Sequence, residues 1–213
     1  DAIWIRFDTI AMRTYFRAHE LPLSRLAPDR IVQKSMTGFS WLWRRDRNVQ
    51  GQRMMVSGQA VASGLGVHAN NELTYTLPDF VRSFRTRVAL DAAAERGGCV
   101  RGIIYLDSTK NKPLYRSDII VGSGKILDSR ELRLPLAKDR PRRLVLMADA
   151  AHADRPSGAD PLDIRDMLDW IDPVLHLDPG RLGEAVVRSV LPSGSAWKGW
   201  DASLAGGNDI LLS

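Results

Sequence analysis

Cysteine is nearly absent from this 213-residue chain, which contains only Cys99. A single cysteine excludes an intrachain disulfide, a cysteine-rich metal site and a disulfide-stapled scaffold. Because no histidine and acid accompany Cys99, we expect a small buried hydrophobic side chain and not a nucleophile. Long apolar runs are also missing. No run reaches the roughly 20 residues that a membrane-spanning helix needs, so we predict no membrane span.

Recognisable catalytic motifs are missing as well. Ser63-Gly64 and Ser193-Gly194-Ser195 have the composition of turns, and no Gly-x-Ser-x-Gly elbow surrounds these serines. The chain has many aspartates, but nothing in their spacing selects two as the paired carboxylates of a glycoside hydrolase. We therefore predict a binding protein and not an enzyme.

The charge distribution gives little sign of a nucleic-acid partner. The net charge of +5 comes from 30 Lys and Arg against 25 Asp and Glu. The basic clusters Arg44 to Arg47 and Lys138 to Arg143 are short, far apart and interrupted by aspartate. No nucleic-acid-binding motif accompanies them. We expect solvated surface at both clusters, with a polyanion-binding patch as the alternative.

Short runs of alternating apolar and other residues dominate the centre of the chain. Phe84, Thr86 and Val88 alternate with Arg85 and Arg87, which is the period-two pattern of a strand with one buried face. Gly, Pro, Asp and Ser clusters separate such runs. The pattern predicts an all-β fold, a jelly-roll β-sandwich with few short helical turns. Strands are expected at residues 72–77, 84–90, 100–106, 130–136 and 143–148, with a hairpin turn at residues 57–59.

Two motifs carry a family resemblance. Gly64-Leu65-Gly66-Val67-His68-Ala69 precedes a strand-like run, and Asp166-Met167-Leu168-Asp169-Trp170 follows far downstream. In order and spacing, these and the intervening segments resemble the NPCBM family of carbohydrate-binding modules. The resemblance implies a galactose-binding-domain-like sandwich that binds sugars without catalysis. It also implies an exported protein, periplasmic or extracellular, with a glycan ligand and with other domains or subunits as partners.

The resemblance divides the chain into three parts. Residues 1–20 form an N-terminal strand and connector, residues 21–178 form the sandwich, and residues 179–213 form a C-terminal extension. Leu182 to Arg188 in the extension fits a short helix or a strand. The extension either adds edge strands, through Ile210 to Leu212, or begins a further segment.

Sugar-binding sites combine an aromatic face with planar polar groups that bridge hydroxyls. Loops at one end of the sandwich offer both. In the alternative interpretation the tryptophans belong to the core, because their large apolar surface gains by burial, and the histidine holds its turn through a backbone hydrogen bond. Trp170 is expected to fill the sandwich interior. The candidate sugar-binding residues are Trp41, Trp43, Arg44, Asp46, His68, Asn70 and Asn71.

The second motif departs from the family pattern. Asp166-Met167-Leu168-Asp169-Trp170 stands where the family commonly has Asp-His-Ala-Asp-Trp. A sugar site that used this histidine would be weakened or absent. The alternative function is therefore a structural or protein-interaction subunit with a degenerate sugar site.

An acidic stretch suggests a metal. Asp163, Asp166 and Asp169 carry oxygen ligands of the kind that calcium takes, without the EF-hand pattern. They are the candidate ligands of a structural calcium ion. The alternative is that three-residue spacing places them on one solvated side of a helical turn.

Overall fold

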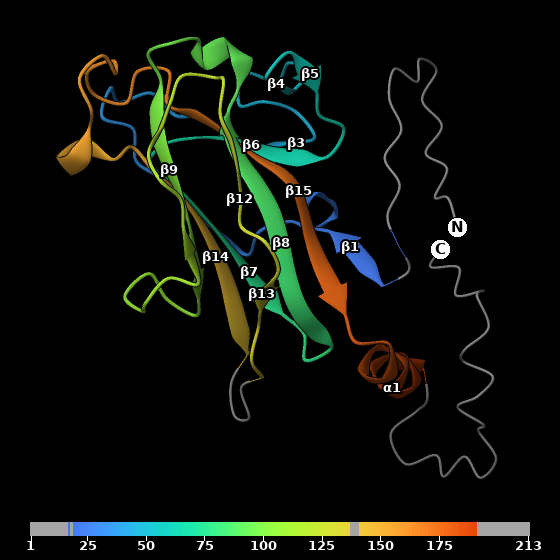
Figure 1. Ribbon diagram of the computed structural model, residues 1–213. Helices are drawn as coiled ribbons and strands as arrows, with labels where there is room; N and C mark the ends of the chain where they lie inside the picture. The colour runs from blue at the N-terminus through green and yellow to red at the C-terminus, as the bar shows by residue number, and fades with distance from the viewer. Residues whose placement is uncertain (1–16, 18, 137–140, 191–213) are drawn as a thin grey trace, which may run out of the picture.

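The computed structural model describes residue 17, residues 19–136 and residues 141–190 (Figure 1). Within these residues the strands are β1 (Glu20–Pro22), β2 (Arg30–Gln33), β3 (Arg44–Arg45), β4 (Met55–Val56), β5 (Gln59–Ala60), β6 (Gly64–His68), β7 (Asn71–Leu77), β8 (Val81–Leu90), β9 (Cys99–Leu106), β10 (Tyr115–Arg116), β11 (Ile120–Val121), β12 (Ile126–Asp128), β13 (Leu132–Arg133), β14 (Arg142–Asp149) and β15 (Met167–Leu177). The helical elements are η1 (Leu23–Arg25), η2 (Ala92–Ala94), η3 (His152–Asp154) and α1 (Pro179–Val190).

Two antiparallel sheets form the sandwich. The first sheet has the order β12-β8-β15-β6-β3, with β1 paired to β15 and β13 paired to β8. The second sheet has the order β10-β9-β14-β7-β2, with β11 paired to β9. The hairpin β4-β5 lies apart from both sheets. The predicted all-β sandwich with few helical turns is therefore confirmed.

Alternation along the strands decides which side of each sheet is buried. Phe84 and Val88 on β8 are fully buried in the core, whereas Arg85 and Arg87 are exposed on the outer face. Trp170, in the first half of β15, is also fully buried. The predicted role of Trp170 in the sandwich interior is therefore confirmed.

The motif glycines of β6 leave room for a crossing segment. A Cβ at Gly66 would lie 2.3 Å from the carbonyl oxygen of Arg47, and one at Gly64 would lie 2.7 Å from the sulfur of Met54. Neither glycine has a left-handed backbone, so space and not conformational freedom requires glycine at these positions. The chain after β3 thus packs closely over β6.

The elements expected from the sequence match those of the structure to different degrees. The strand expected at residues 130–136 contracts to β13, and beyond it the N–H of Leu134 still donates to the carbonyl oxygen of Arg82 on β8 at 2.8 Å. The predicted hairpin turn is present between β4 and β5. Leu182 to Arg188 lies within α1, so the helical interpretation holds. The N-terminal strand, expected at residues 2–7, and the edge strand expected at residues 210–212 lie outside the described residues.

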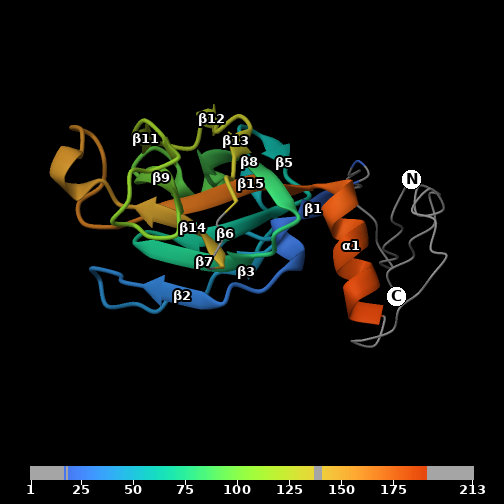
Figure 2. The ribbon, with the colours of Figure 1, turned by 90° about the horizontal axis from the view of Figure 1, so that it is seen from below.

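The chain enters and leaves the sandwich at the same end. Glu20 of β1 pairs with His176 near the end of β15, and α1 begins shortly afterwards at Pro179. Figure 2 shows α1 projecting from this end, away from the sheets. No helix among the described residues is long and apolar enough to cross a membrane. The other end of the sandwich, called here the loop end, is formed by residues 34–43, 69–70, 91–98 and 150–166.

Candidate functional site

A ring stack lies beneath the loop end. The indole of Trp41 and the imidazole of His68 are parallel within 6°, with centroids 4.7 Å apart. Trp41 is partly buried and packs against the core, and its Nε1 has no hydrogen-bond partner among the described residues. His68 covers one face of this ring, so that face is closed to a sugar.

His68 is buried and hydrogen-bonded to the backbone. It is only 3% exposed, and its Nδ1 lies 2.6 Å from the carbonyl oxygen of Ala69. A carbonyl can only accept, so Nδ1 carries the proton of this hydrogen bond. Burial lowers the pKa of His68, which keeps the ring neutral. The structure thus contains the backbone hydrogen bond of the alternative interpretation.

Asn70 and Asn71 face different surroundings. Asn71 is buried and donates its amide to the Oε1 atom of Gln33 at 3.0 Å. Gln33 in turn donates to the backbone oxygens of His68 and Asn70. Asn70 is half-buried, and its Oδ1 accepts from the N–H of Ala150 at 2.9 Å. The Nδ2 of Asn70 makes no hydrogen bond to the described residues, so this amide can serve a ligand.

The other three candidates lie along the β6 edge. Arg44 pairs opposite Gly66, and the Oδ1 of Asp46 accepts from the N–H of Gly64 at 3.1 Å. Trp43 packs against the core, with the guanidinium of Arg45 5.5 Å from its ring centroid. Four residues of extended strand, roughly 13 Å, separate the position of Asp46 from His68. The structure therefore places these three candidates along β6, with Asp46 the farthest from His68.

A polar group beside Asn70 was not among the sequence candidates. Arg101 of β9 lies opposite Asp149 of β14 in the sheet register. Its Nη1 is 3.7 Å from Asp149 Oδ2, and its Nη2 donates to Asp154 at 2.9 Å. Asp149 directly precedes Ala150, the residue that binds the Asn70 side chain. We call Asn70, Arg101, Asp149 and Asp154 the polar rim.

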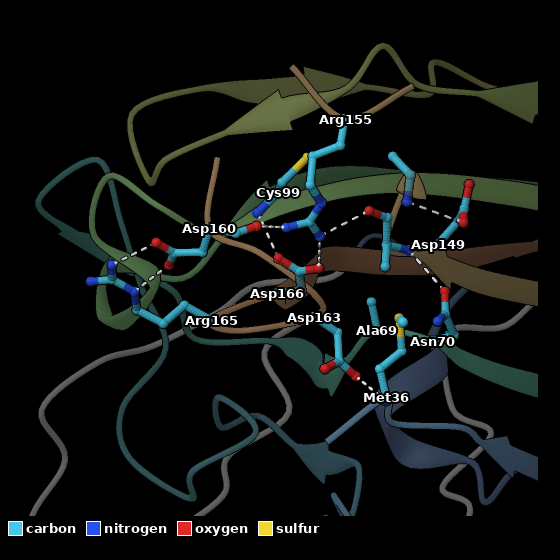
Figure 3. A network of polar contacts seen from close by, with 12 residues as sticks. Met36, Ala69, Asn70, Cys99, Asp149, Arg155, Asp160, Asp163, Arg165 and Asp166 are labelled. Atoms are coloured by element: carbon cyan, nitrogen blue, oxygen red, sulfur yellow. Dashed lines mark hydrogen bonds and ion pairs between the residues drawn. The ribbon is translucent and has the colours of Figure 1, made fainter. Parts of the chain in front are cut away.

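A second network lies behind the polar rim (Figure 3). Arg155 donates to the carbonyl oxygen of Ala150 at 3.0 Å and to Asp166 Oδ2 at 2.5 Å. It also donates to the carbonyl oxygen of Asp160. The other carboxylate oxygen of Asp166 accepts from the N–H of Cys99 at 2.7 Å. These bonds fix the two ends of the segment 150–166 against β9 and β14.

The proposed calcium ligands have other partners. Asp166 is bound by Arg155 and Cys99, and Asp163 Oδ2 accepts from the N–H of Met36 at 2.7 Å. Asp169 lies on β15 beside Asp91. No group of three or more His, Cys, Asp or Glu in residues 17, 19–136 and 141–190 could hold a metal ion. The geometry thus contradicts both alternatives, because the three aspartates are buried separately and are neither clustered nor solvated.

Burial dominates the protonation of two of these aspartates. It raises the pKa of Asp166 to about 7, although Arg155 and the Cys99 amide favour the charged form. Burial also raises the pKa of Asp169 well above its ordinary value, and the neighbouring Asp91 adds to the rise. Burial likewise raises the pKa of Cys99, which is free and buried as expected. None of these groups lies open to a ligand.

Comparisons with known proteins agree with this architecture. The model of the NPCBM/NEW2 domain family matches residues 20–176. No curated protein matches the chain. These boundaries include β1 and end just before α1.

Solved structures share the fold. A CBM51 module from Clostridium perfringens GH95, in complex with methyl-galactose, is 20% identical with a TM-score of 0.56, covering 73% of this chain and 99% of the module. The CBM51-2 and INT domains of Clostridium perfringens ZmpB, in complex with GlcNAc, are 20% identical with a TM-score of 0.53, covering 80% of this chain and 35% of theirs. A third structure contains the M60 catalytic domain of Clostridium perfringens ZmpB together with CBM51-1 and CBM51-2. It is 20% identical with a TM-score of 0.54, and the match covers 74% of this chain and 15% of that structure's chain. The described sandwich is thus CBM51-like.

Proposed function

Because the chain belongs to the NPCBM/NEW2 domain family, we propose that it is a non-catalytic carbohydrate-binding module that holds a glycan at the polar rim. The single observation that carries this proposal is the convergence of an amide, a guanidinium and two carboxylates at one end of the sandwich. Trp41 and His68 support the rim from beneath and do not stack on the sugar.

The rim has the chemistry that sugar hydroxyls require. Each hydroxyl both donates and accepts, so a carboxylate beside a guanidinium can bridge two neighbouring hydroxyls. Asp149 and Arg101 form such a pair, and the Nδ2 of Asn70 adds a donor beside them. Arg101 is only 7% exposed, which holds its guanidinium in place before a ligand arrives. A site fixed in advance loses less entropy on binding.

The position of the rim also suits an appended module. The chain enters and leaves at the end that carries α1, and the rim lies at the opposite end. Neighbouring domains joined there would leave the rim open. The solved relatives include sugar complexes and a CBM51 pair beside a catalytic domain. We propose, by analogy, an exported multidomain protein in which this sandwich brings a catalytic domain to its glycan.

One observation favours a second candidate function. Three large apolar side chains of the segment 34–43 are exposed: Met36 by 50%, Phe39 by 68% and Leu42 by 65%. Exposed apolar side chains in one segment are typical of protein-binding surfaces. A protein-interaction domain with a degenerate sugar site would use this segment and not the polar rim.

A glycan array with the purified protein tests the proposal. The wild type and Asn70→Ala are compared, since this substitution removes the free amide. Asn111→Ala is the matched control, because Asn111 is exposed beyond β9 at the opposite end. We expect binding by the wild type and the control, and loss of binding in an Asn70→Ala protein that remains folded, with a somewhat lower melting temperature because the N–H of Ala150 loses its acceptor. Absence of binding to every glycan, together with stable co-purification of a partner protein, would favour the second function.

A further inference from the structure

The guanidinium of Arg155 holds together both ends of the segment 150–166, which borders the polar rim. Arg155 donates to the carbonyl oxygens of Ala150 and Asp160 and to the carboxylate of Asp166. Ala150 is the first residue of the segment 150–166, and Asp166 is its last. Figure 3 shows the guanidinium of Arg155 directed toward Asp160 and Asp166. A single side chain therefore sets the path of this seventeen-residue segment at both ends.

The same residue that Arg155 binds also orients Asn70. The carbonyl of Ala150 accepts from Arg155, whereas the N–H of Ala150 donates to Asn70 Oδ1. If Ala150 turned, the Asn70 amide would lose the bond that directs its Nδ2. Asp149, the preceding residue, would move with it. Arg155 itself is mostly covered, with 11% of its side chain exposed, and reaches the site only through Ala150.

We propose that Arg155 is a positioning residue for the glycan site, which fixes Ala150 so that Asn70 and Asp149 face the ligand together. This inference rests on the proposed function, because it assigns Arg155 a task at the same rim. Arg155 does not contact the glycan.

The opposite end of the sandwich provides a matched control. Arg142 is 2% exposed and donates to the carbonyl oxygens of Val81, Leu134 and Pro78. It therefore resembles Arg155 in burial and in the kind of partners, but it lies far from the rim. Loss of Arg142 tests what removal of any buried arginine does to the sandwich.

The experiment compares Arg155→Ala and Arg142→Ala in the full chain at pH 6. Burial raises the pKa of Asp166 to about 7, so pH 6 favours the protonated carboxyl when Arg155 is removed. Two readouts are recorded. One is the hydrogen exchange rate of the Ala150 amide without ligand. The other is affinity for immobilised galactoside and N-acetylglucosamine probes.

We expect Arg155→Ala to exchange the Ala150 amide at least about tenfold faster and to bind the retained glycan about tenfold more weakly, the loss that one well-placed hydrogen bond explains. A low, non-denaturing concentration of guanidinium chloride should restore both readouts, whereas sodium chloride should not. Arg142→Ala should leave both unchanged. If Arg155→Ala does not fold, Arg155→Lys replaces it, with an intermediate effect expected because an ammonium cannot span the three acceptors.

Unchanged Ala150 exchange in a folded Arg155 variant would overturn the positioning role, whatever the probes bind. If the wild type binds neither probe while Ala150 exchange still depends on Arg155, the glycan function fails and the positioning of Asn70 stands. Equal losses in the Arg142 variant would also overturn the proposal, because they would show a general structural effect.

Discussion

The indole of Trp41 and the imidazole of His68 lie parallel, with centroids 4.7 Å apart. This contact bears on the role of Trp41, which the sequence analysis names as a candidate sugar-binding residue. One ring face is occupied by His68, and the ring packs against the sandwich core. Trp41 therefore belongs to the scaffold, and we propose that the ligand binds at the polar rim.

Trp41→Ala should lower the free energy of unfolding by about 2 kcal/mol, because it removes a partly buried ring and leaves a gap over His68. Trp41→Phe should recover most of that loss and should still bind glycan. Chemical denaturation measures the first effect, and the glycan array measures the second. Phe39→Ala, at an exposed position, is the control and should change stability by less than about 0.5 kcal/mol. Loss of binding in a stable Trp41→Phe protein would show that the indole contacts the ligand.

Gly66→Ala should destabilise the protein by at least about 2 kcal/mol, since the new Cβ would meet the backbone of Arg47 and Asn48. Backbone cannot move aside as a flexible side chain can. Gly124→Ala is the matched control, because nothing lies within 4 Å of its Cβ position and its φ is not positive. Thermal melting compares the two variants. Equal melting temperatures would contradict the close approach of the segment after β3 to β6.

Asp169→Asn should stabilise the protein at alkaline pH. Neither carboxyl oxygen of Asp169 receives a hydrogen bond from the described residues, and Asp91 is its acidic neighbour, so we expect a protonated Asp169 to donate to Asp91. Burial raises the pKa of Asp169 well above 3.8, so the folded state keeps a proton that the unfolded state releases. The stability that this proton provides is full below about pH 4 and declines as pH rises toward the folded pKa.

An asparagine donates to Asp91 without titrating, so the advantage of Asp169→Asn should grow by at least about 1 kcal/mol between pH 5 and pH 8. Denaturation at both pH values measures this. Asp118→Asn, at an exposed site, should show no such change. A melting temperature that rises with calcium and falls with chelator in the wild type alone would contradict the shared proton, because Asp91 and Asp169 would then hold a cation.

Local sequence patterns were sufficient to predict the architecture. Alternation in β8 placed Phe84 and Val88 inside and the arginines between them outside, and burial of Trp170 followed from its large apolar surface. The Gly-x-Gly-x-His-Ala motif was recognised as a family feature. Its physical reason, the space that Gly66 leaves for Arg47 and Asn48, needed the structure.

The polar rim could not be predicted in the same way. Arg101 and Asp149 meet because β9 and β14 pair in one register, and no pattern within either segment reports that register. The spacing of Asp163, Asp166 and Asp169 suggested a common ligand, yet each carboxyl group has its own neighbours. Their partners Met36, Cys99 and Asp91 come from distant segments.

The central claim, that glycan binds at the polar rim, is tested most directly by titrating the isotope-labelled protein with its array-selected glycan and following backbone amide resonances. The account predicts that the backbone amides of Asn70, Arg101 and Ala150 show the largest chemical-shift changes, and that all three saturate with one common dissociation constant. Shift changes confined to Trp43, Arg44 and Asp46 at the β6 edge, with the rim unmoved, would contradict it.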